Sequence, residues 1–416
     1  MIQTRRTGAA PSGQPQANGR IPTAGDRWRA LLLATFAFAV CFVVWGLIAP
    51  LAPTFRTLYG LSATQVGLLV AVPAILGSVA RIPFGLLTDR YGGRRVFAAL
   101  LLFLLLPTAV AGLTRSYGAL VADCFVLGLA GASFAVGVPF VARWFPPAQQ
   151  GVALGIYGMG NVGTAAASFA APRLADGLGW PGAFWAVLPL LLATSIVFWL
   201  LGRDAPGFVG GGAPLAQRLA VFHRQPLAWV LALFYFVTFG GFLAMSTYLP
   251  TLLVGEYGLT PAEAGGRAAA FVLVATFARP LGGYLADRWG GAPILQVVFL
   301  VVAALAIVLA FGPGLVLRTA TFLTTAAALG LGNGAVFKLV ADHFPRQTGT
   351  VTGLVGAAGG LGGFFPPLVM GAVHDVTGSY AVAFVLLAAF ALGCFVVNLL
   401  ALQRRAPALA ARDEHA

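Results

Sequence analysis

The chain has 416 residues, of which 59% are hydrophobic and only 9% are charged, and its formal net charge is +13. A soluble domain carries about 25% charged residues, so this composition excludes a protein that faces water on all sides. The basic residues lie between hydrophobic runs and not in one aromatic-rich patch, which argues against nucleic-acid binding. The three cysteines, Cys41, Cys124 and Cys394, lie in apolar runs without disulfide or metal-ligand spacing, so we expect no metal and no cofactor.

The apolar runs predict a helical protein with twelve transmembrane spans. Each run is close to the ~20 residues that cross a hydrocarbon core, and Gly, Pro and charged residues mark its ends. In the first half we expect spans at 30–52, 65–88, 95–113, 118–142, 150–172 and 181–201. In the second half we expect them at 226–254, 263–287, 293–313, 316–341, 350–373 and 379–402.

The segments outside the spans predict the domain organisation. Residues 1–27 are rich in Pro, Gly and Gln and lack the apolar core of a signal peptide, which is typical of a disordered tail. Segment 203–225 holds consecutive glycines and mixed charge, so we expect a linker between one half at 28–202 and another at 226–403. Most of the 25 Lys and Arg residues lie on the side of this linker and of both tails, the second being 404–416. The positive-inside rule therefore predicts that both termini are cytoplasmic.

The two halves repeat one another in sequence. The stretch from Arg81 to Gly93 (RIPFGLLTDRYGG) returns as Arg279 to Gly291 (RPLGGYLADRWGG), with the Arg, Asp, Arg and paired Gly positions aligned. Transporters use parallel repeats of this kind to build a substrate site between two halves near the bilayer midplane.

The loop part of this repeat carries a family resemblance. Residues 85–94 (GLLTDRYGGR) resemble the motif between spans 2 and 3 of the major facilitator superfamily. The resemblance implies an all-α membrane protein of two pseudo-symmetric six-helix bundles, in which motif residues pair across the halves and re-pair when the halves rock. The residues given this conformational role are Gly85, Asp89, Arg90, Asp287 and Arg288. The alternative interpretation is a glycine-rich turn whose arginines only follow the positive-inside rule.

Arg81 and Arg279 predict an anion site. A charged side chain in mid-membrane costs ~2.5–3.5 kcal/mol even on insertion scales, and no carboxylate lies at a comparable depth in the predicted spans. The planar guanidinium fork matches a planar oxyanion better than a lysine ammonium does. The alternative is that each arginine bonds backbone carbonyls or cytoplasmic carboxylates and only shapes helix packing.

Two glycine-rich segments narrow the resemblance further. Span 5, within the stretch 144–163, and span 11, within 349–367, look like the paired signature segments of the nitrate/nitrite porter family. Their glycines recur at helical steps and would let helices approach closely around a narrow pathway, or they serve only as packing contacts. The signature glycines are Gly155, Gly158, Gly160, Gly163, Gly353, Gly356, Gly360 and Gly363.

The resemblance implies a function and a set of substrate-binding residues. It implies a transporter of nitrate, nitrite or both in the bacterial cytoplasmic (inner) membrane, working by rocker-switch alternating access without a cofactor. Its anion clamp corresponds to Arg81 and Arg279, and its other binding residues to Phe134, Asn161, Tyr235 and Phe239. Tyr235 and Phe239 also fit a simpler interpretation as core aromatics at i and i+4.

The coupling ion is the least determined property. Proton symport needs a titrating group, and the single lysine of the sequence, Lys338 in NGAVFK, is the candidate; this stretch looks more like the family's symport members. We therefore expect nitrate/proton symport. The alternative is nitrate/nitrite antiport, which needs no titrating group, with Lys338 paired to Asp342 at i+4 and structural.

Two further classes of function fit the sequence less well. The four histidines lie in loops or tails without nucleophile–base or metal spacing, so we do not expect an enzyme. A facilitator for another small organic anion or a drug would need a roomier cavity and often uses intramembrane carboxylates, which the spans lack.

Overall fold

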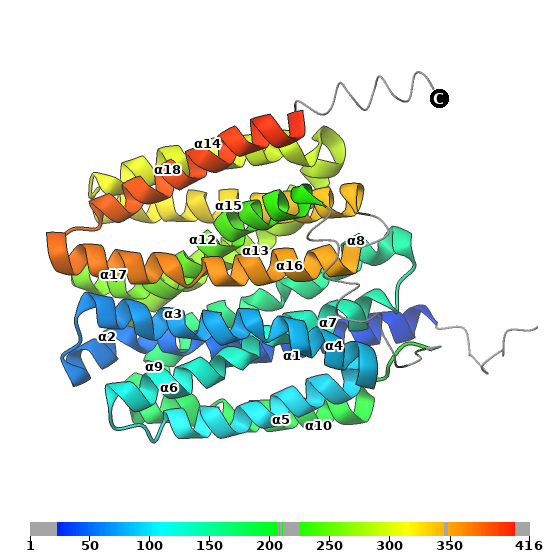
Figure 1. The fold of residues 1–416 in the computed structure, drawn as a ribbon. Coiled ribbons are helices and arrows are strands. Elements are labelled where there is room, and N and C mark those ends of the chain that lie inside the picture. The colour runs from blue at the N-terminus through cyan, green and yellow to red at the C-terminus, as the bar shows by residue number, and fades with distance from the viewer. Residues whose placement is uncertain (1–22, 207, 209, 211–224, 345–347, 404–416) are drawn as a thin grey trace, which may run out of the picture.

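The computed structural model describes residues 23–206, 208, 210, 225–344 and 348–403, and within them it contains helices and no strand (Figure 1). The expected tail at 1–27, the linker at 203–225 and the tail at 404–416 lie largely or wholly outside the described residues. In the described part, eleven helical stretches are long and apolar enough to cross a membrane. This chain is therefore a multi-pass helical membrane protein.

One of these stretches supplies two crossings. Val152–Leu201 has 50 residues, more than twice the ~20 that one crossing requires. Gly179 interrupts it with φ +73° and ψ 161°, a conformation that ends a helix and that glycine tolerates best. The described residues thus provide the twelve expected spans.

The first six crossings form one bundle. They consist of α1 (Ala24–Gly46) with α2 (Ile48–Tyr59), α3 (Ala63–Val79) with α4 (Arg81–Tyr91), α5 (Gly93–Ala111), α6 (Tyr117–Leu127) with η1 (Gly128–Ala132) and α7 (Ser133–Ala142), α8 (Pro147–Gly158) with η2 (Met159–Asn161) and most of α9 (Val162–Trp185), and α10 (Leu188–Leu201).

The second six crossings form the other bundle. They consist of α12 (Pro226–Tyr257), α13 (Pro261–Trp289), α14 (Gly291–Ala310), α15 (Leu315–His343), α16 (Thr348–Gly362) with α17 (Phe365–Thr377), and α18 (Ala381–Asn398) with η3 (Leu399–Gln403).

The repeat of the sequence is also a repeat of local structure. The second crossing begins with a capping box, Ser62 with Gln65, and its counterpart α13 begins with another, Thr260 with Glu263. These reciprocal hydrogen bonds satisfy the free N–H groups that start a helix. The crossings end alike as well, since Gly92 and Gly290 cap them with φ of +85° and +86°.

The two bundles meet most closely at one end of the molecule. There α17 packs along α3, and α12 packs against α2 (Figure 1). Asp375 of α17 accepts hydrogen bonds from the backbone N–H groups of Ala63 (2.8 Å) and Thr64 (2.7 Å) and from the Thr64 hydroxyl (2.5 Å). An acidic side chain of one bundle thus caps the first turn of a helix in the other, where the helix dipole favours a negative charge. We call this the Asp375 end; α1 begins and η3 finishes at the opposite end.

Candidate anion-binding site

Arg81 lies at the break between α3 and α4, and its side chain reaches the other bundle. It is 7% exposed, and its Nη1 donates a hydrogen bond to the backbone carbonyl of Gly356 in α16. Its Nε has no hydrogen-bond partner. The Gly356 contact is the kind of backbone partner that the packing interpretation anticipates, but it leaves the charge of Arg81 uncompensated.

Arg279 occupies the corresponding place in α13. Its Nη2 donates to the Tyr235 hydroxyl at 2.9 Å, whereas its Nη1 is buried without a partner. In the described part of the chain, the ion pairs involve other cations, and neither Arg81 nor Arg279 is in one. Two guanidinium groups, one from each bundle, therefore lack a carboxylate among the described residues; that of Arg81 is buried and that of Arg279 is half-buried.

Aromatic rings surround both guanidinium groups. The ring of Phe239 lies 5.8 Å from Cζ of Arg81 and 5.5 Å from Cζ of Arg279. Phe134 lies 5.5 Å from Cζ of Arg81 on another side. Tyr235 stacks on Phe239 with centroids 5.0 Å apart and an interplanar angle of 2°. These cation–π contacts hold the arginines without neutralising them.

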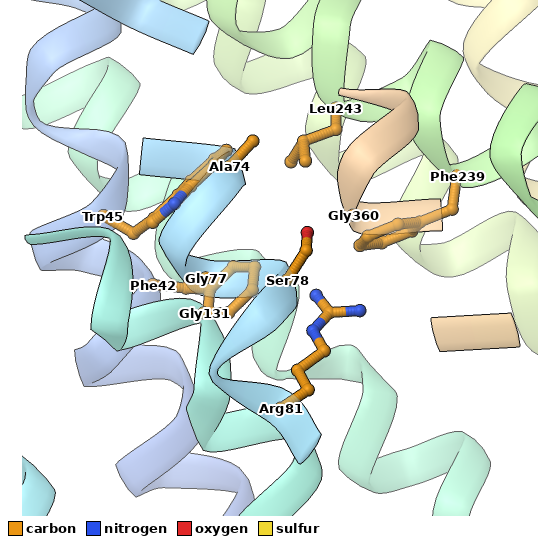
Figure 2. Close-up of a pocket in the computed structure, with 10 residues that line it drawn as sticks. All are labelled: Phe42, Trp45, Ala74, Gly77, Ser78, Arg81, Gly131, Phe239, Leu243 and Gly360. Atoms are coloured by element: carbon orange, nitrogen blue, oxygen red, sulfur yellow. The ribbon is translucent and has the colours of Figure 1, made fainter. Parts of the chain in front are cut away.

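All six residues implied as substrate-binding line one small cavity. Arg81, Arg279, Phe134, Asn161, Tyr235 and Phe239 border it together with Phe38 and Phe42 of α1. The Asn161 side chain is buried; its Nδ2 donates to the Gly158 carbonyl at 2.8 Å, and its Oδ1 has no partner. A second small cavity adjoins Arg81 and Phe239 and is also lined by Trp45, Ser78 and Gly360 (Figure 2).

Three further aromatic residues lie at or beside this cavity, namely Phe38, Phe42 and Tyr157. Phe38 and Phe42 lie in the largely apolar stretch 30–46 of α1, so nothing in the sequence separates them from core residues. Tyr157 stacks on Phe38 at 4.9 Å and donates its hydroxyl proton to the Ser133 carbonyl at 2.7 Å. The one sequence feature that points to Tyr157 as a site residue is its position within the span-5 signature segment.

The signature glycines differ in what surrounds them. A Cβ on Gly356 would lie 3.5 Å from Arg81 Nη1, one on Gly360 would lie 3.4 Å from Arg81 Cζ, and one on Gly158 would lie 4.0 Å from Arg279 Cζ. Gly160, Gly163 and Gly363 pack tightly against Phe38, the Ala39 carbonyl and Leu243 respectively. Gly155 and Gly353 have open space where a Cβ would point. Six of the eight therefore face the site or its helix contacts.

The loop-motif residues lie at the end opposite to the Asp375 end. Asp89 forms an ion pair with Arg143 at 2.5 Å, and Asp287 forms one with Lys338 at 3.1 Å. Lys338 also pairs with Asp342 at 2.7 Å and is 31% exposed. Gly85 has open space at its Cβ position. Arg90 and Arg288 each lie over the ring of the following aromatic residue.

A further arginine, Arg318, lies inside the second bundle. Arg318 is only 2% exposed and forms an ion pair with Glu256 beside the ring of Tyr257. The first turn of α15 carries it into the bundle, where α12 supplies its partner.

Comparisons with known proteins agree with this architecture. The sequence profile described as "Major Facilitator Superfamily" matches residues 34–367. A "Nitrite extrusion protein" of Bacillus subtilis is 41% identical over 88% of this chain and 92% of its own length. A "Probable nitrate/nitrite transporter NarK2" of Mycobacterium tuberculosis is 42% identical over 87% of this chain and 93% of its own. A "Probable nitrate transporter NarT" of Staphylococcus haemolyticus is 38% identical, with 88% and 94% covered.

Solved structures show the same fold. A bacterial homologue of the human lysosomal transporter Spinster, in an inward-facing and occupied conformation, superposes with a TM-score of 0.74 at 19% identity, covering 91% of this chain and 97% of the other. The human organic anion transporter MFSD10 gives a TM-score of 0.68 at 18% identity, with 89% and 99% covered. Together with the named relatives, the fold defines a membrane transporter. The chain belongs to the major facilitator superfamily and, within it, to the nitrate/nitrite porter family.

Proposed function

We propose that this protein carries nitrate and nitrite across the bacterial cytoplasmic membrane, binding one anion at a time between Arg81 and Arg279. The observation that carries the proposal is a pair of guanidinium groups, one from each bundle, that form no ion pair with a carboxylate in the described part of the chain; Arg81 is buried and Arg279 is half-buried. Planar N–H forks suit the planar oxygens of both ions. The relatives named for nitrate and nitrite support the same substrates.

The size and lining of the site favour small ions over organic substrates. The cavities at Arg81 are small and bordered mainly by aromatic rings and glycines. A drug or a larger organic anion would have to displace helix α16, whose backbone contacts Arg81 directly. A compact, weakly hydrated anion requires a much smaller opening.

Alternating access follows from the position of the site. Each bundle contributes one arginine, so rocking one bundle against the other opens the site to one face or the other. The Asp375 end would be the outer face, with both termini cytoplasmic, as the distribution of basic residues predicts. The close packing of α17 on α3 would then close the outer face in the conformation described.

Two modes of coupling fit this mechanism. The sequence of α15 favours proton symport with Lys338 as the titrating group. The structure favours exchange, because two carboxylates beside Lys338 stabilise its charged form. In addition, the empty site would bury two like charges whenever the bundles close, which disfavours reorientation without an anion.

Transport by purified protein in liposomes tests both the proposed substrates and the mode of coupling. We expect nitrate to enter vesicles loaded with nitrite and not vesicles loaded with buffer, with or without an inward proton gradient. Lys338→Ala should retain this exchange. Uptake driven by a proton gradient alone and abolished in Lys338→Ala would establish symport instead. Failure to move either ion, with uptake of an organic anion, would overturn the proposed substrate.

A further inference from the structure

We propose that the Ser78 hydroxyl is a further anion-binding group, placed one helical turn before Arg81 on the side toward the Asp375 end. This inference rests on the proposed transport of a small anion. It assigns to Ser78 the donation of a hydrogen bond to an oxygen of the anion held by Arg81.

The first observation is an unpartnered hydroxyl in a cavity. Ser78 is 1% exposed, and its Oγ has no hydrogen-bond partner. It lines the cavity that adjoins Arg81, and its hydroxyl and the Arg81 guanidinium point into the same gap (Figure 2). A buried polar group without a partner is unfavourable, so a ligand that accepts its proton would bind with a gain in free energy.

Ser78 lacks the local hydrogen bond that several buried hydroxyls of these helices form, as do the hydroxyls of Ser168, Thr238, Thr251 and Thr276. Thr108, Thr194 and Thr325 each donate to the carbonyl four residues earlier, at 2.6, 2.7 and 2.8 Å. That local bond is the usual solution for a hydroxyl inside a membrane helix. The Ser78 hydroxyl is directed into the cavity instead.

Gly360 keeps room for this hydroxyl. A Cβ at Gly360 would collide with Ser78 Oγ and would also lie 3.4 Å from Arg81 Cζ. The absence of a side chain there leaves the hydroxyl and the guanidinium open to the same space. This gives one signature glycine a definite role.

The repeat supplies a second, independent observation. The sequence Ser78-Val-Ala-Arg81 has its counterpart in Thr276-Phe-Ala-Arg279. Thr276 is 1% exposed, and its Oγ1 also lacks a partner. Each bundle therefore carries a buried, unpartnered hydroxyl one turn before its arginine. The repeat thus gives both arginines a buried hydroxyl neighbour at the same place, of which only Ser78 borders one of the two cavities.

Anion binding to the purified protein tests the assignment. Nitrate affinity would be measured from the rise in melting temperature with nitrate concentration, because a ligand of the folded state stabilises it. We expect Ser78→Ala to bind nitrate roughly tenfold more weakly, the effect of losing one hydrogen bond to a charged group. Ser78→Thr keeps a hydroxyl, the one that the residue at position 276 carries, so its nitrate affinity should stay within about threefold of the wild type.

The controls separate this proposal from the broader one. Thr108→Ala removes a buried hydroxyl that is already bonded to Leu104, so nitrate affinity should not change. Unchanged affinity in Ser78→Ala, or an equal loss in Ser78→Thr or Thr108→Ala, would overturn the role of the hydroxyl while the proposed substrate stands. Absence of nitrate and nitrite binding by the wild type would overturn the proposed function itself, and the Ser78 assignment with it.

Discussion

At the scale of single residues, the two arginines differ in how they are held. Arg81 contacts the opposite bundle through the Gly356 carbonyl, whereas Arg279 is fixed within its own bundle by Tyr235. An anion arriving between them would compete only with the Gly356 carbonyl. Arg81 is therefore the side chain whose partners change most when substrate binds.

Replacing either arginine by lysine tests the clamp. Arg81→Lys and Arg279→Lys keep the charge but lose the planar fork, so we expect transport to fall at least about tenfold while the protein still inserts and folds. Initial rates of nitrate exchange in liposomes measure this. Arg267→Lys, on the same helix as Arg279 but outside the site, is the matched control. Near wild-type rates in both clamp variants would contradict the proposed role.

The sequence predicted part of this site, and the reason is physical. Arg81 and Arg279 stand out because charge is costly in a membrane span, so cost alone marks them. Phe38 and Phe42 cannot be recognised in this way, because an aromatic side chain is equally favourable in the protein core and against lipid. The hydroxyls of Ser78 and Thr276 were also missed, since whether a hydroxyl bonds to its own helix depends on its rotamer.

At the scale of elements, α16 is the helix that closes over the site. Its face toward the first bundle is bare backbone at Gly356 and Gly360, where Arg81, Phe134 and Ser78 lie against it. Close approach of this kind needs small residues, because lipid tails provide no hydrophobic drive for helix association.

A bulky residue on that face should stop transport. We expect Gly356→Leu to reduce nitrate exchange by about a hundredfold or more, since even its Cβ would meet Arg81 and Phe134 at 3.5 Å. Gly353→Leu is the matched control on the same helix, because its Cβ position is open. Exchange rates are compared at equal amounts of inserted protein. Equal rates in the two variants would show that α16 does not border the pathway.

The number of membrane crossings and their helical structure could be predicted from the length of the apolar runs. The positions at which the helices are interrupted could not. The helical stretch Val152–Leu201 is divided into two crossings at Gly179, one of many glycines in a sequence that contains 54. A positive φ is dictated by the packing around a turn, and composition does not show which glycine adopts it.

At the scale of the whole molecule, Asp375 joins the two bundles at one end. Its carboxylate receives three hydrogen bonds from the first turn of α3, all of which must break if the bundles separate there. These bonds favour the conformation described over one that is open at the Asp375 end.

Removing this carboxylate should shift the conformational balance. In Asp375→Ala we expect a larger population open at that end, because three hydrogen bonds to a charged acceptor are lost. Spin labels at Leu58 and Val316, exposed residues of the two bundles, would report longer distances by electron paramagnetic resonance. Labels at Leu58 and Leu113, within one bundle, should show no change. An unchanged distance between the labels at Leu58 and Val316 would contradict the proposal that Asp375 holds the two bundles together at this end.

The two guanidinium groups without carboxylates also bear on energetics across the whole membrane. A site that keeps its charge through the cycle returns to its starting state after exchanging one monovalent anion for another, so no net charge crosses. A membrane potential of 100 mV is worth about 2.3 kcal/mol per transferred charge, and an electroneutral cycle receives none of it. The direction of exchange would then follow the two concentration ratios alone, even in a strongly polarised cell that repels anions.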